Sequence, residues 1–181
     1  MTLISSRLFF DIWKQITNDN KQVLLDQWQN YKNYTSLIKG SENSILSQIA
    51  IKLNLFVYEK DYYSVDAIFF NADDLCPKIQ DKTYWFRNLQ IAFEHENNFY
   101  SGLYQEISHL IILNSPLKVL VTYPDNIEHG EKELEYFTEI IKGNRNELQF
   151  SEKEEILVIY GFREDFSWHG YIYKSEGWLK L

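Results

Sequence analysis

Cysteine is nearly absent from this sequence, with Cys76 the only one in 181 residues. A single cysteine excludes an internal disulfide and a zinc site built from cysteines, and it suits the reducing cytoplasm. The three prolines are too few for long linkers. No window approaches the roughly 20 apolar residues of a membrane span, and the first residues lack the pattern of a signal peptide. We therefore expect a soluble cytoplasmic protein with no membrane partner.

Positive charge is also scarce. The chain has 18 Lys and Arg residues against 26 Asp and Glu residues, which gives a net charge of −8. This balance weighs against nonspecific nucleic-acid binding, whose affinity comes mostly from basic side chains on phosphates. It leaves open a nuclease with a local basic groove and an acidic metal site. It equally suits a protein that covers a basic partner.

What the chain does contain is enough apolar material for one packed core. Hydrophobic residues make up 45% of the sequence and aromatic residues 17%, which excludes a disordered chain. The length suits a single domain over 1–181. We divide it into a helical N-terminal elaboration (1–40), a core of about 42–124, and a C-terminal helix plus two strands (125–181).

The periodicity of apolar residues predicts an α/β fold. Helical spacing fills the first third of the chain, and β-branched and aromatic runs follow, after which helices and strands alternate. The run 116–124 is nearly all apolar, as is typical of a buried parallel strand, so we expect a mixed sheet. The predicted helices cover 8–16, 22–37, 45–53, 99–113 and 128–148, and the predicted strands cover 54–59, 62–70, 85–96, 116–124, 154–162 and 169–175.

Asp66 stands out because its predicted strand is apolar or aromatic on both faces. Such a strand is buried on both sides, and a buried carboxylate without a partner is costly. Something must therefore neutralise Asp66. The alternative is an aspartate held by hydrogen bonds for structural reasons, or one at the end of a strand.

Glu94 and Glu96 form a second acidic feature, in the stretch Phe93-Glu-His-Glu-Asn97. Residues i and i+2 of a strand share a face, so both carboxylates project together while His95 points the opposite way. If the hairpin strand pairs here, Asp66 can join them. Three carboxylates around one point is the ligand chemistry of Mg²⁺ or Mn²⁺.

The order Asp66, 27 intervening residues, Glu94-His95-Glu96, a helix and the strand PLKVLVTY resembles the core of the restriction-endonuclease-like nucleases. These carry the motif PD-(D/E)xK on an αβββαβ core, which the elements expected over 42–124 match in order. The resemblance implies that Asp66 and Glu94 bind the metal and that the substrate is nucleic acid. It further implies metal-assisted phosphodiester hydrolysis, with Glu96 as a further ligand or general base.

The sequence departs from that motif at two positions. Val65 replaces the proline, and Glu96 replaces the lysine, which gives the Glu-x-Glu element that some restriction enzymes of this superfamily use. Lys118 can approach the site as a migrated lysine, or it can be merely solvated. Glu106, on the helix between the strands, can support the metal ligands or sit at a solvated helix edge.

Other signals favour no further chemistry. The four histidines show no metal-ligand spacing, and no phosphate-binding glycine loop or Ser-His-Asp order is present. Two alternatives to a nuclease remain open. One is a noncatalytic acidic protein, such as an immunity protein, that binds a basic partner. The other is a structural or regulatory domain without a site.

Overall fold

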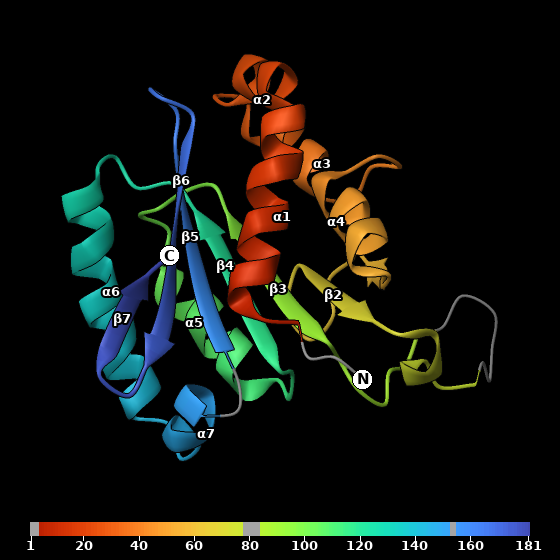
Figure 1. The fold of residues 1–181 in the computed structure, drawn as a ribbon, viewed down its shortest axis with the longest axis vertical. Helices are drawn as coiled ribbons and strands as arrows, with labels where there is room; N and C mark the ends of the chain where they lie inside the picture. Colours follow the sequence, from red (N-terminus) through yellow and green to blue (C-terminus); the bar gives the residue numbers. More distant parts are fainter. Residues whose placement is uncertain (1–3, 78–83, 153–154) are drawn as a thin grey trace.

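A computed structural model describes residues 4–77, 84–152 and 155–181 of this protein. Within these residues the sheet has seven strands, which lie side by side in the order of the sequence, β1 to β7 (Figure 1). Strands β3, β4 and β5 are parallel, and the other neighbouring pairs are antiparallel. The expectation of an α/β fold with a mixed sheet is confirmed. The strands are β1 (Phe56–Tyr58), β2 (Ala67–Phe70), β3 (Ile91–Glu96), β4 (Leu117–Thr122), β5 (Glu155–Phe162), β6 (Ser167–Lys174) and β7 (Gly177–Lys180).

Helices cover both faces of this sheet and make a three-layer sandwich (Figure 1). Helices α1 to α4 pack on one face, and α5 to α7 pack on the other. Over the residues described, no helix is long and apolar enough to cross a membrane. The helices are α1 (Ser6–Asp19), α2 (Lys21–Gln27), α3 (Tyr31–Ile38), α4 (Ile45–Leu53), α5 (Leu103–Ile112), α6 (Ile127–Lys142) and α7 (Glu147–Glu152), with a 3₁₀ turn η1 (Ala72–Asp74).

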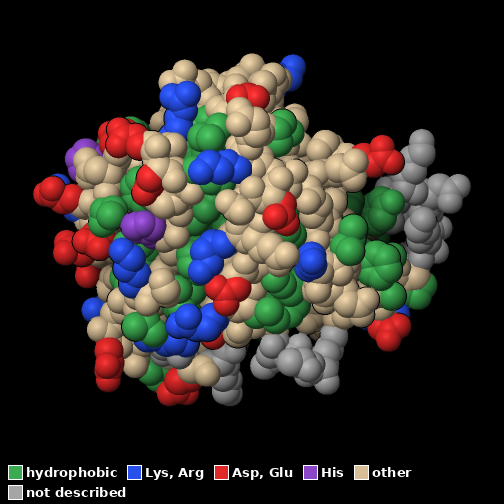
Figure 2. Space-filling view, turned by 45° about the horizontal axis from the view of Figure 1, so that its top comes forward, with side chains coloured by type: hydrophobic (Ala, Val, Ile, Leu, Met, Phe, Trp, Pro, Cys, Tyr) green, Lys and Arg blue, Asp and Glu red, His purple; other side chains and the backbone are tan. Residues whose placement is uncertain are grey.

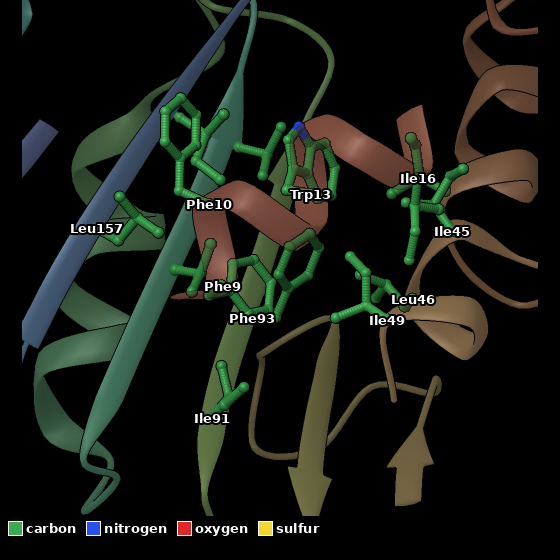
Figure 3. Packing of buried hydrophobic residues seen from close by; sticks show 14 of the residues in the cluster. Phe9, Phe10, Trp13, Ile16, Ile45, Leu46, Ile49, Ile91, Phe93 and Leu157 are labelled. Carbon is green, nitrogen blue, oxygen red and sulfur yellow. The ribbon is translucent and has the colours of Figure 1, made fainter. Parts of the chain in front are cut away.

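Helix α1 shows how the sequence builds the first layer. The Ser5 side chain caps its N-terminus by accepting a hydrogen bond from a backbone N–H of the first turn. Phe9, Trp13 and Ile16 then recur at helical spacing and are buried. In Figure 3 they pack between the sheet, represented by Phe93, and the neighbouring helix α4. This contact fixes β3, the strand that carries the acidic stretch.

The element order expected over 42–124 is present as α4, β1, β2, β3, α5 and β4. The first three strands form antiparallel neighbours, and α5 connects β3 to the parallel strand β4. The apolar run at 116–124 is the fully buried strand β4, as its composition predicts.

The predicted strand over 62–70 is wrong for residues 62–66. Tyr63 and Ser64 have φ values of 52° and 67°, in the left-handed region, so the chain turns here instead of extending. Backbone hydrogen bonds between Tyr62 and Val65 close the turn, and β2 begins only at Ala67. Asp66 therefore lies directly before β2 and not inside a strand. This agrees with the alternative given above, in which Asp66 stands at the end of a strand.

The other errors concern where elements begin, end or break. Within the described residues, the C-terminal part holds two helices and three strands, whereas one helix and two strands were predicted. The predicted helix over 128–148 breaks into α6 and α7, and the prediction missed strand β7. The helix over 22–37 breaks into α2 and α3, and the strand over 85–96 starts only at Ile91. Residue 154 of the strand expected over 154–162 lies outside the described residues.

Candidate metal centre

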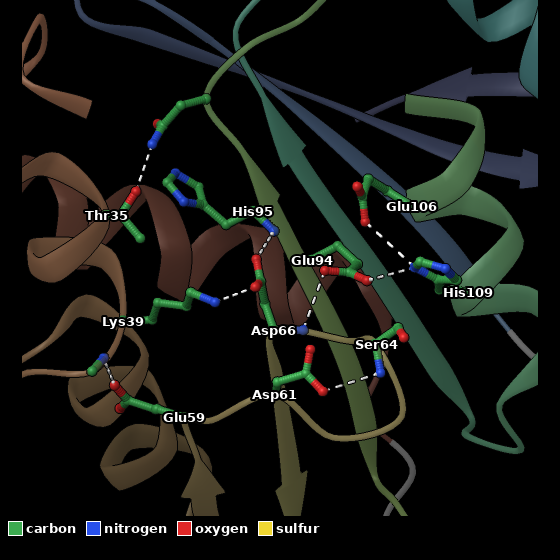
Figure 4. Close-up of polar contacts among 12 residues, drawn as sticks. Thr35, Lys39, Glu59, Asp61, Ser64, Asp66, Glu94, His95, Glu106 and His109 are labelled. Atoms are coloured by element: carbon green, nitrogen blue, oxygen red, sulfur yellow. Dashed lines mark hydrogen bonds and ion pairs between the residues drawn. The ribbon is translucent and has the colours of Figure 1, made fainter. Parts of the chain in front are cut away.

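The acidic stretch at the end of β3 follows the alternation of a strand. Ile91 and Phe93 face helices α1 to α4, whereas Ala92 faces the other helical layer. Glu94 therefore projects toward α5, and His95 projects toward the opposite layer (Figure 4). There the His95 ring stacks on Tyr34. Glu94 is only 3% exposed. A buried carboxyl group thus lies between the sheet and α5.

Asp66 lies directly beside Glu94, because Ala67 pairs with Phe93 in the antiparallel ladder. The Asp66 backbone N–H donates a hydrogen bond to the Glu94 carboxylate at 3.2 Å. The Asp66 carboxylate accepts one from the backbone N–H of His95 at 2.9 Å and pairs with the ammonium of Lys39, which follows α3 (Figure 4). Lys39 is therefore the partner that neutralises Asp66.

Glu94, Glu106 and His109 form the tightest group of possible metal ligands among the described residues. One ligand atom from each lies within 4.8 Å of the others. Nδ1 of His109 is 3.7 Å from a carboxylate oxygen of Glu94 and 3.7 Å from one of Glu106. Figure 4 shows both α5 side chains turned toward Glu94 on β3. The contact between one strand and one helix thus creates the group.

The electrostatics of this group favour a bound cation. Burial raises the pKa of Glu94 far above its ordinary range, and the negative charges of Asp66 and Glu106 raise it further. Burial also raises the pKa of Glu106. Without a cation, Glu94 therefore holds a proton at neutral pH. A divalent ion would replace that proton and offset the repulsion between the carboxylates.

Glu96 does not belong to this group, although it shares a face with Glu94. Its carboxylate accepts a hydrogen bond of 2.6 Å from the backbone N–H of Asn98, beyond the end of β3. Its negative charge still raises the pKa of Glu106. The structure thus brings Asp66, Glu94 and Glu106 together and leaves Glu96 at the margin.

Lys118 is placed differently from the expectation. It is fully buried in β4, and its ammonium donates to the Ser115 carbonyl at 2.6 Å. In the ladder between β3 and β4, Lys118 lies opposite Ala92, two residues before the position opposite Glu94. The contact with Ser115 turns the amine toward the start of β4 and therefore away from Glu94. The cation beside the carboxylates is Lys39.

Two residues of the site were missed from the sequence, His109 and Lys39. Glu106 and His109 are three apart, a spacing that puts both side chains on one face of a helix and that carboxylate-bridged metal sites use. That spacing was a usable signal. Lys39 gives no such signal, because it precedes Asp66 by a turn, a helix and a strand, and only tertiary packing brings the two together.

Comparison with known proteins adds no assignment: no family model matches the chain, and no curated protein matches it.

Proposed function

We propose that this protein binds a divalent cation through Glu94, Glu106 and His109 and uses it to hydrolyse phosphodiester bonds. One observation carries the proposal. Oε1 of Glu94 and Nδ1 of His109 are buried and lie 3.7 Å apart, and neither atom has a hydrogen-bond partner within the described residues unless the Glu94 and Glu106 carboxyl groups share a proton. Buried polar atoms in native proteins are nearly always satisfied. A metal ion between these atoms and Glu106 would satisfy both.

The donor set fits a particular kind of ion. Carboxylate oxygens bind both Mg²⁺ and Mn²⁺, but an imidazole nitrogen suits Mn²⁺ and other transition metals better than Mg²⁺. With His109 in the group, we therefore expect tighter binding of Mn²⁺ than of Mg²⁺. Such an ion supplies Lewis-acid polarisation of a phosphoryl oxygen and a water of lowered pKa.

The surrounding residues have separate roles in this proposal. The Asp66 N–H orients the Glu94 carboxylate. Lys39, beside Asp66, brings positive charge to the edge of the site, where a phosphate of the substrate needs it. Glu96, on the same face and partly exposed, is the candidate proton acceptor.

Topology gives the proposal further support. The elements α4, β1, β2, β3, α5 and β4 follow the αβββαβ order of the restriction-endonuclease-like nucleases. Asp66, directly before β2, lies beside Glu94 on β3, and these are the two residues that the resemblance makes metal ligands. The proposed ligand set differs from the motif in using Glu106 and His109 from α5.

Titration with MnCl₂ in a calorimeter tests the metal site. We expect the wild type to bind one ion, and His109→Ala to weaken binding at least about tenfold, since even residues that only support ligands change affinity by about 10–100-fold. Glu135→Ala, an exposed carboxylate of α6, is the matched control and should bind like the wild type. Absence of binding in the wild type, or equal losses in both variants, would contradict the site.

Nicking of supercoiled plasmid DNA with Mn²⁺ tests the chemistry separately. We expect slow nicking that EDTA stops. Lys39→Met should lower the rate about tenfold or more while leaving Mn²⁺ affinity nearly unchanged, because the lysine acts on the phosphate and not on the ion. If Mn²⁺ binds but neither DNA nor RNA is cut, the metal site stands and the hydrolytic function is wrong.

A further inference from the structure

A cleft of about 720 Å³ opens at the carboxyl-terminal ends of the parallel strands β4 and β5, apart from Glu94 and α5. Its walls are the segment from β4 into α6, the turn between β5 and β6, and Trp28 from the break between α2 and α3. This volume is in the range of ligand-binding clefts, and the carboxyl ends of parallel strands are a common place for them.

Negative charge dominates the lining of the cleft. Asp125 and Glu128 come from the α6 side, and Glu164 and Asp165 come from the turn between β5 and β6, against one cation, Arg163. In Figure 2, acidic side chains gather on the side of the molecule where α6 lies in Figure 1. The cleft therefore attracts cations.

The same charges exclude an anionic ligand. The cleft includes the N-terminus of α6, whose backbone N–H groups and dipole would otherwise attract a phosphate. Asn126 already caps this end by accepting a hydrogen bond from the His129 N–H at 2.9 Å, and Asp125 and Glu128 flank it. A phosphate would face these carboxylates, so nucleic acid is a poor fit here.

Aromatic side chains form the apolar part of the walls. Trp28 and Tyr123 lie edge to face with ring centroids 5.2 Å apart, and Phe162 packs against His169 at 5.1 Å. Trp28 and Tyr123 also line a smaller hollow, together with Tyr34. Tyr34 is 1% exposed, and its ring lies edge to face against that of Tyr123, with centroids 5.5 Å apart. The aromatic wall of the cleft therefore continues into this hollow.

We propose that this cleft is a docking site for an arginine side chain of a basic polypeptide. A guanidinium is planar, stacks on aromatic faces, and donates several hydrogen bonds to carboxylates at once, which an ammonium does less well. Glu128 and Glu164 are exposed and make no ion pair or hydrogen bond within the described part of the chain, so both are free to receive it. The net charge of −8 adds a long-range attraction to such a partner. The proposal is independent of the metal site.

Calorimetric titration in EDTA with three short peptides, in which glycine alternates with arginine, lysine or glutamate, tests the docking site. We expect the arginine peptide to bind at least about threefold more tightly than the lysine peptide, and the glutamate peptide not to bind. The double variant Glu128→Gln with Glu164→Gln should weaken arginine binding about fivefold. Phe162→Leu keeps an apolar side chain but removes a stacking face, and it should narrow the preference for arginine over lysine.

The matched control is Glu135→Gln with Glu139→Gln, which removes the same charge from exposed positions of α6 outside the cleft. It should leave arginine binding within about twofold of the wild type. Equal weakening by both double variants would reduce the effect to diffuse charge attraction and overturn the proposal. Equal affinity for arginine and lysine peptides, or no binding of either, would overturn it as well.

Discussion

Replacing Glu94 with glutamine is expected to abolish the metal site and at the same time to stabilise the metal-free protein. The variant keeps the shape of the side chain and removes its charge. Mn²⁺ affinity and plasmid nicking should both fall by about 100-fold or more, since a carboxylate ligand is lost. The free energy of unfolding without metal should rise by about 1–3 kcal/mol at pH 7.

The sign of the stability change follows from the proton on Glu94. Burial, with Asp66 and Glu106 nearby, raises the pKa of this group to about 10 in the folded protein, whereas an unfolded glutamate titrates near 4.5. Between these values the folded state holds a proton that the unfolded state releases, so wild-type stability falls as pH rises through this window. Below pH 4.5 Glu94 is protonated in both the folded and the unfolded state, so it no longer changes the free energy of unfolding. Glutamine cannot ionise, so its curve should lack this fall.

Urea unfolding in EDTA at pH 5, 7 and 9 measures the effect. The gain of Glu94→Gln over wild type should be small at pH 5 and grow with pH. The control is Glu96→Gln, two residues along the same face but outside the ligand group, with an expected change within about 0.5 kcal/mol at every pH. In Mn²⁺ the wild type should become more stable than Glu94→Gln, because the ion binds the folded wild type and not this variant. A Glu94→Gln protein that is less stable than wild type at pH 9 would contradict the assigned protonation.

Truncation of Trp13 should cause the largest loss of stability of any change considered. Trp13 is fully buried, and its ring lies 6.0 Å from that of Phe93 and 5.2 Å from that of Trp168. It therefore joins α1 to both β3 and β6. Trp13→Ala leaves a cavity the size of an indole and should cost about 3–5 kcal/mol in the free energy of unfolding.

Two further variants make this measurement specific. The Trp13 indole N–H is buried without a hydrogen-bond partner within the described residues, so Trp13→Phe removes an unsatisfied donor along with some packing and should cost less than Trp13→Ala. Leu8→Ala, on an exposed face of the same helix, should cost less than about 1 kcal/mol. Similar costs for all three variants would mean that α1 does not anchor the sheet.

The fold was predictable where the pattern of apolar residues is regular over a whole element. Helices α1 and α4 and strand β4 lie close to where their spacing and composition put them. Prediction failed at the turn before β2, because Tyr63 and Ser64 carry no glycine signal for their left-handed backbone. It also failed for β7, a short strand that pairs with β6 at one edge of the sheet.

For the site, the sequence alone determined the direction of the side chains on β3. The alternation of a strand puts Glu94 and His95 on opposite faces whatever surrounds them. Tertiary structure decided which groups meet Glu94. Helix α5 brings Glu106 and His109 over the strand, and the end of α3 brings Lys39 to Asp66. Such contacts depend on how elements pack across the sheet, and local periodicity carries no record of that packing.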